Sequence, residues 1–146
     1  MALTLNQIVK QITTFGNNHK QIKFVYFGDV WERLSNGEVT YPAMFFTLID
    51  AQILTKQIQY NFSIYVMDRM LMEETNETDV LSDMTLVAQD MVAKLRSPEY
   101  NWLTGDNMAM SFYTESDPDY LAGVKIDFSL TLSSLNDTCQ IPTNGI

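Results

Sequence analysis

The sequence has few of the residues from which metal sites and active sites are built. Its 146 residues include one cysteine, Cys139, and one histidine, His19. A single cysteine excludes an internal disulfide, and with it a small secreted domain that disulfides stabilise. One histidine and one cysteine also argue against a tetrahedral zinc site within one chain. His19 has no nucleophile motif nearby, so the sequence favours a solvated loop histidine.

Positive charge is scarce as well. Nine lysines and arginines stand against 18 aspartates and glutamates, which gives a net charge of -9. A protein that grips nucleic acid usually presents a basic surface, so this balance argues against a nucleic-acid-binding protein. It leaves open a protein whose wall faces DNA without holding it.

Long apolar runs are absent. No stretch reaches the ~18 apolar residues of a transmembrane helix, and the N-terminus does not resemble a signal peptide. Apolar residues make up 46% of the chain and charged residues 18%, a balance that excludes intrinsic disorder. We expect one domain over residues 1–135 and a C-terminal arm over residues 136–146.

The acidic run over residues 68–79 has the composition of a cation site but not its pattern. Calcium loops place oxygen ligands at alternating positions and usually have a glycine at the turn. This run has no glycine and carries Met70, Leu71 and Met72 in its middle. The sequence therefore favours a charged loop that leads into a helix, and we expect neither a metal nor a cofactor.

Two segments have the apolar spacing of helices. Apolar residues recur at helical positions over residues 5–15, with Thr4 and Gln7 as a capping box and Gly16 as the expected stop. A broader apolar face over residues 80–95 predicts a second helix.

Extended patterns predict strands over residues 22–27, 40–54, 57–67, 108–114 and 120–133. In residues 57–67 apolar and polar side chains alternate, so one face is expected to be buried and the other polar. The short link at Thr55 and Lys56 predicts an antiparallel hairpin. The order α-β-β-β-α-β-β predicts an α+β fold, in which two helices flank an antiparallel sheet and strands adjacent in sequence pair. The polar face of the predicted sheet could face solvent, a partner subunit or a lumen.

Some residues are of types that assembly interfaces favour. Nine methionines are many for this length, and methionine adapts to irregular contacts. Met67, Met70 and Met72 cluster where a strand leaves the hairpin, and Trp31 and Tyr41 are large side chains on or near loops. Ordinary core packing explains these residues equally well.

At the centre of the chain an ordered series of segments resembles a known family. The series comprises residues 26–32 (YFGDVWE), Gly37, 40–42 (TYP), 60–68 (YNFSIYVMD), 74–77 (ETNE) and 80–83 (VLSD), followed by Ala88, Asp90 and Leu95. It resembles the tail terminator, or tail completion, proteins of phages, including crAss-like phages of gut bacteria. The resemblance covers residues 26–95, about half of the chain.

The resemblance implies a tail-terminator-like fold and a structural role without catalysis. Members of the family form rings at the end of a tail tube or at the head–tail junction. The chain would be made in the bacterial host cytoplasm and reside in the virion, in the tail or neck. Six subunits are expected, with twelve as the alternative nearer the portal, and the neighbours would be connector, portal-side or tail tube proteins. DNA would pass through the lumen without specific binding, and no membrane is involved.

In the family, the long hairpin and the adjoining loops contact neighbouring subunits or the next ring. The resemblance places these contacts at residues 47–64 and 68–77. The candidate interface residues are Trp31, Tyr41, Ile49, Gln52, Ile58, Met67, Met70, Met72 and Glu74. No family motif follows Pro98, so the resemblance does not decide which ring of the virion the chain joins.

Two functions of other classes are alternatives. The first is a monomeric binding module that holds a peptide in the Met-rich loop over residues 67–72, and a persistent monomer would distinguish it. The second is an enzyme without a recognisable motif, for which Asp29, Glu32 and Asp106 are unpaired loop acids.

Overall fold

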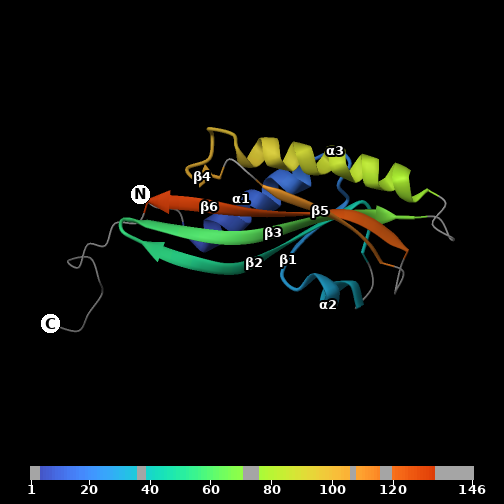
Figure 1. Ribbon diagram of the computed structural model, residues 1–146, viewed down its shortest axis with the longest axis horizontal. Coiled ribbons are helices and arrows are strands. Elements are labelled where there is room, and N and C mark those ends of the chain that lie inside the picture. Colours follow the sequence, from blue (N-terminus) through green and yellow to red (C-terminus); the bar gives the residue numbers. More distant parts are fainter. Residues whose placement is uncertain (1–3, 36–38, 71–75, 106–107, 116–119, 134–146) are drawn as a thin grey trace.

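The computed structural model describes residues 4–35, 39–70, 76–105, 108–115 and 120–133. Within these residues the elements are α1 (Leu5–Asn18), β1 (Phe24–Phe27), α2 (Val30–Ser35), β2 (Ala43–Leu54), β3 (Gln57–Arg69), α3 (Glu77–Leu95), β4 (Leu103–Thr104), β5 (Ala109–Glu115) and β6 (Leu121–Ser133). The strands form one six-stranded sheet, and α3 and α2 lie on opposite sides of it (Figure 1). The predicted α+β class is confirmed.

The strand order differs from the predicted order. The sheet runs β1-β2-β3-β6-β4, and β5 also pairs with β6. β1 pairs with β2 in parallel, from Phe24 opposite Ala43 to Phe27 opposite Phe46. The prediction that strands adjacent in sequence pair antiparallel is therefore wrong here. The cause is α2, which was not predicted: a parallel pair needs a crossover, and α2 lies in this one.

The long hairpin of β2 and β3 is confirmed. Pairing runs from Ala43 opposite Met67 to Leu54 opposite Gln57, with a β-bulge between Leu48 and Asp50. In the turn, Lys56 has a φ of 62°, a left-handed conformation of the kind that the second central residue of some two-residue turns adopts. β3 pairs with β6 along its whole length, so β2, β3 and β6 form the long central part of the sheet.

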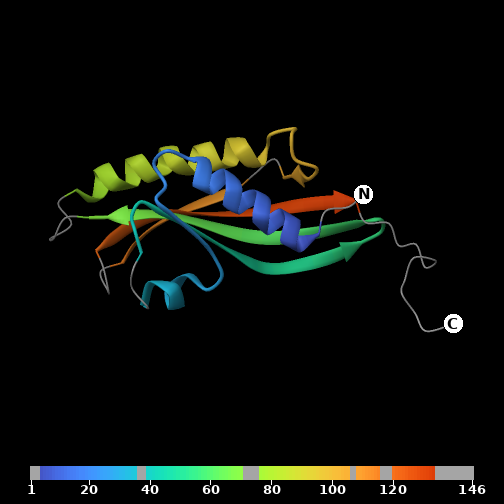
Figure 2. The same ribbon diagram turned by 180° about the vertical axis from the view of Figure 1, so that it is seen from behind.

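The main core lies between this sheet and the helices α1 and α3. The capping box at Thr4 and Gln7 is present and begins α1, which lies across the strands in Figure 2. The buried side chains of the main core include Ile8, Ile12, Phe15, Met44, Phe46, Phe62, Ile64, Val66, Val80, Met84, Val87, Met91, Leu95, Val124, Ile126 and Phe128. The apolar side chains of β3 thus face the helices, as their alternation predicts.

Gly16 does not end α1 as expected, because the helix continues to Asn18. A Cβ atom at Gly16 would lie 2.9 Å from Met44 Sδ and 3.1 Å from Val25 Cγ2. The glycine therefore lets α1 approach the sheet closely.

His19 follows α1 and is not the solvated loop residue that the sequence favours. Its side chain is only 15% exposed, and Nε2 lies 2.8 Å from Asp90 Oδ2 on α3. The backbone N–H of Gln21 donates to Nδ1 at 3.1 Å. The imidazole therefore links the end of α1 to α3.

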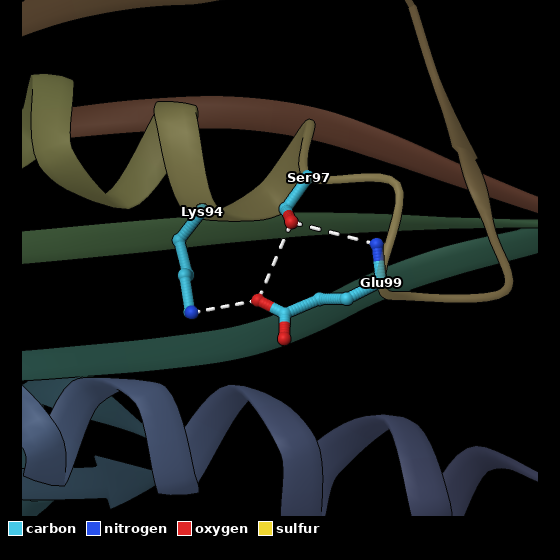
Figure 3. Close-up of polar contacts among 3 residues, drawn as sticks. All are labelled: Lys94, Ser97 and Glu99. Atoms are coloured by element: carbon cyan, nitrogen blue, oxygen red, sulfur yellow. Dashed lines mark hydrogen bonds and ion pairs between the residues drawn. The ribbon is translucent and has the colours of Figure 1, made fainter.

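The end of α3 is closed by polar and aromatic contacts. Lys94 Nζ lies 2.7 Å from Glu99 Oε1, and the Ser97 hydroxyl donates to the same oxygen at 3.3 Å (Figure 3). The indole N–H of Trp102 donates to the carbonyl of Leu95 at 2.8 Å. These contacts direct the chain from α3 back to the sheet edge at β4.

A second core occupies the other face of the sheet, beneath α2. Its buried residues are Val30, Leu34, Ala43, Phe45, Met67 and Leu121. These residues lie at the β1 end of the sheet, whereas the hairpin extends beyond α2 in Figure 1. No described helix covers the hairpin half of this face.

Candidate functional site

The candidate site is the hairpin half of the sheet, on the face opposite to the main core. Side chains there alternate with Phe62 and Ile64, which point into the main core. Residues directly opposite one another in a sheet share a face. The register places on this face Thr47, Asp50, Gln52, Gln59, Asn61, Ser63, Asp127, Ser129 and Thr131, which we call the polar sheet face.

Hydrogen bonds join these side chains across the strands. Asn61 Nδ2 donates to Asp50 Oδ1, and the Ser129 hydroxyl donates to Asn61 Oδ1 at 2.5 Å. The Ser63 hydroxyl donates to Asp127 Oδ1 at 2.5 Å. These bonds form two sets, one that holds the carboxylate of Asp50 and one that holds the carboxylate of Asp127. They give the face a defined polar surface without apolar side chains at its centre.

The charge of the polar sheet face is acidic. Asp50 and Asp127 are the only charged members of the nine residues that define it, and within the described part of the chain Lys125 lies next to it, with Nζ 3.7 Å from Asp127 Oδ1. The same Nζ lies 5.7 Å from the ring centroid of Tyr65, toward the second core. A face of this kind has no row of cations with which to hold a phosphate backbone.

Two strand edges border the sheet. β1 pairs with β2 only as far as Phe46, and Ile49 through Leu54 are all exposed. On the opposite side, β5 pairs with β6 alone among the described strands. Large apolar side chains are exposed at both edges, with Ile53 80% and Phe112 56% exposed. Both edges are therefore accessible in the described part of the chain.

The predicted interface residues lie in different surroundings. Ile49 and Gln52 lie on the open edge of β2 and are exposed. Ile58 is half-buried against the main core. Tyr41 is half-buried, and the guanidinium carbon of Arg69 lies 5.0 Å from its ring centroid. The structure thus brings Ile49 and Gln52 together and separates them from Tyr41.

The other predicted interface residues contribute no described contact surface. Met67 is buried in the second core and Met70 in the main core. Both methionines therefore serve ordinary core packing. The side chain of Trp31, and Met72 and Glu74 altogether, lie outside the described residues. Because the side chains of Met67 and Met70 are buried, they cannot contact a peptide as the binding-module alternative requires.

Among the acids of the enzyme alternative, Asp29 has a structural contact. Asp29 Oδ1 accepts a hydrogen bond from the backbone N–H of Glu32 at 3.0 Å, which caps the short helix α2. Asp106 lies outside the described residues. Among the residues with described positions, no group of three or more histidines, cysteines, aspartates and glutamates could hold a metal ion.

Asp68, at the end of β3, has a shifted pKa. Burial raises the pKa of its carboxyl above the usual 3.8, and the charge of Asp83 on α3 adds to the rise. The Arg69 backbone N–H, which donates to Asp68 Oδ1 at 2.8 Å, opposes it. The folded state therefore holds this proton more tightly than the unfolded state.

Substitution Asp68→Asn is expected to raise the melting temperature at pH 7. With a pKa raised by folding, stability falls as the pH rises from the usual carboxyl pKa through the folded one. The neutral amide avoids this loss, so the difference from the parent chain should vanish below the usual carboxyl pKa. Thermal unfolding over a pH series measures it. A variant that is less stable than the parent at pH 7 would contradict this account.

Sequence reasoning did not single out Ile53, Phe112 or Asp127 as functional residues. A signal existed for the polar sheet face, because the alternation in β3 already separates Asn61 and Ser63 from the apolar side chains. No signal marked the open edges, because pairing between distant strands decides which edges stay free.

Two comparisons with known proteins find no relative of this chain. A scan against models of protein families finds no match to this chain, and a search of curated proteins finds none either. No helix in the described ranges has the length and hydropathy needed to cross a bilayer.

Proposed function

We propose that the chain is a non-enzymatic structural subunit of a phage virion, with a tail-terminator-like fold, that forms a ring at the head–tail connector or tail end. The observation that carries the proposal is one sheet whose polar sheet face and two edges are left uncovered by the residues that the structure describes. Monomeric proteins usually cover or protect such edges. A closed ring uses both edges, because each subunit has two neighbours. The phage setting comes from the resemblance of residues 26–95.

The mechanism of such a ring is geometric. The closed ring matches connector, portal-side or tail tube proteins on its two sides and seals the path of the DNA between them. The polar sheet face lines the channel, where Asp50 and Asp127 repel the phosphates. Without a row of cations the wall releases few counterions on contact with DNA, so DNA slides past it.

The mass of the assembled protein tests the proposal. Native mass spectrometry and light scattering are applied to the chain alone over a concentration series, and then with candidate adjoining virion proteins. We expect a closed species of six copies, with twelve as the alternative. Six times 16.7 kDa gives about 100 kDa. A monomer under every condition would contradict the proposal and favour a monomeric binding module.

A further inference from the structure

The open edges of β2 and β5 lack two of the residue types that commonly protect sheet edges. After the bulge, residues 50–54 of β2 keep a continuous register with β3 and are all exposed. Lysines, prolines and very short strands are common protective devices. Neither residues 50–54 nor residues 109–113 of β5 contain lysine or proline. The single charge among them, Asp50, is bonded to Asn61 within its own sheet.

The most exposed large apolar side chain of each segment, Ile53 in residues 50–54 and Phe112 in residues 109–113, lies on the same face of the sheet. Ile53 stands opposite Ile58, which packs against the main core. Phe112 stands opposite Val124, which is buried in the main core. Ile53 and Phe112 therefore both extend the helix-bearing face at its outer limits. Pairing of the two edges would remove both side chains from water, which is favourable.

The strand directions also match. β2 is antiparallel to β3, β3 is antiparallel to β6, and β6 is antiparallel to β5. β2 and β5 thus run in opposite directions within one chain. A second copy placed beside the first in the same orientation brings its β5 antiparallel to β2, which is the more stable kind of pairing.

We propose that neighbouring copies join by antiparallel pairing of β2 residues 50–54 with β5 residues 109–113. This inference rests on the proposed function and names the contact by which the ring closes. Gln52 is on the polar sheet face, and so is Ser111, which stands opposite Lys125. Residues that stand opposite one another in a sheet share a face, so the pairing places Gln52 opposite Ser111 of the next copy. All five residues of each segment then overlap. The contact is head-to-tail, so it repeats from copy to copy until the ring closes.

The contact requires neighbouring copies to be staggered. Within one chain, Ser111 lies level with Phe45 through Lys125 and Tyr65. Pairing with Gln52 therefore shifts the next copy along the strands by about six ladder positions, roughly 20 Å. A closed sheet accommodates such a stagger by tilting its strands.

The size of the contact favours a ring over a dimer. Five residues span roughly 17 Å, and a sheet is roughly 10 Å thick, so the footprint is on the order of 170 Å². Stable pairs bury roughly 800 Å² per partner. A single contact is therefore weak, and assembly needs closure of the ring or a template beneath it.

Disulfide trapping tests the contact because it captures weak association. The full chain carries Cys139→Ser with Gln52→Cys and Ser111→Cys, and is oxidised at high concentration. We expect a ladder of covalent multimers that ends at the ring size and disappears on reduction. The matched control replaces Gln52→Cys by Ala51→Cys, whose side chain is on the opposite face because Ala51 stands opposite Tyr60. We expect its multimer yield to be at least fivefold lower.

A second readout uses charge on the edge. Ile53→Lys is expected to lower the assembled fraction at least tenfold at a fixed concentration, because lysine protects a sheet edge. Leu86→Lys, at an exposed position of α3, should leave the assembled fraction unchanged.

The outcomes separate this inference from the proposed function. Covalent multimers that form with Gln52→Cys and Ser111→Cys, but not with Ala51→Cys and Ser111→Cys, support edge pairing. Equal ladders from both cysteine pairs overturn it. A ring mass without cross-linking overturns this contact and leaves the ring in place. Absence of cross-linking together with a monomeric mass under every condition overturns both.

Discussion

Replacing Phe62 by alanine is expected to lower the free energy of unfolding by about 3–5 kcal/mol. Phe62 is fully buried at the centre of the main core. Its ring stacks on Phe128 of β6, with ring centroids 5.5 Å apart. Truncation removes these contacts and leaves a cavity between the helices and the two longest strands. Folded domains have a total stability of about 5–15 kcal/mol, so this loss takes a large share.

Denaturant unfolding at low protein concentration measures the effect of Phe62→Ala, with Phe112→Ala as the matched control. Phe112 is 56% exposed at the outer edge of the same sheet, so its truncation should cost less than about 1 kcal/mol in the monomer. Equal losses for the two variants would contradict the placement of the main core. The low concentration separates this measurement from the role of Phe112 in edge pairing.

Replacing Gly123 by alanine is expected to lower the free energy of unfolding by about 2–3 kcal/mol. A Cβ atom at this position would lie 2.4 Å from the backbone oxygen of Val66 and 2.6 Å from the hydroxyl oxygen of Tyr113. Gly123 stands opposite Met67 on β3 and Tyr113 on β5. The carbonyl belongs to the neighbouring strand, so the added methyl group forces the backbones of β3 and β6 apart. Thermal or denaturant unfolding measures the loss.

Gly16→Ala is the matched control for Gly123→Ala. Its Cβ would meet Met44 Sδ at 2.9 Å, near the end of a flexible side chain that can move aside. Within helix α1, alanine is also favoured over glycine by about 1 kcal/mol. Val25 Cγ2 would lie 3.1 Å away and must also shift, so the net loss should be smaller than at Gly123. A loss at Gly16 that equals the loss at Gly123 would contradict the close approach of backbone at Gly123.

The elements predicted well from the sequence are those that local patterns determine. Thr4 and Gln7 define the start of α1 through side-chain to backbone bonds within one turn. Thr55 and Lys56 define the hairpin, because a two-residue link brings β2 and β3 together as antiparallel neighbours. The alternation in β3 likewise separates the main core from the polar sheet face.

The elements missed from the sequence depend on contacts between distant segments. α2 has six residues and β4 has two, too few for an apolar period to show. Without α2, nothing in the sequence indicated that β1 pairs with β2 in parallel. The alternation in β3 also placed Met67 on the same face as its polar residues. α2 covers Met67 and turns a surface position into a core position. The open edges could not be predicted either, since they are what remains after all strands have paired.

Electron cryo-microscopy of the assembled chain tests the central claim most directly. The account predicts a closed ring with a central channel lined by the polar sheet face, Asp50 and Asp127 included. It also predicts one continuous sheet across the subunit boundary, where Gln52 of one copy lies beside Ser111 of the next. A ring with the polar sheet face turned outward, or particles without a channel, would contradict the account.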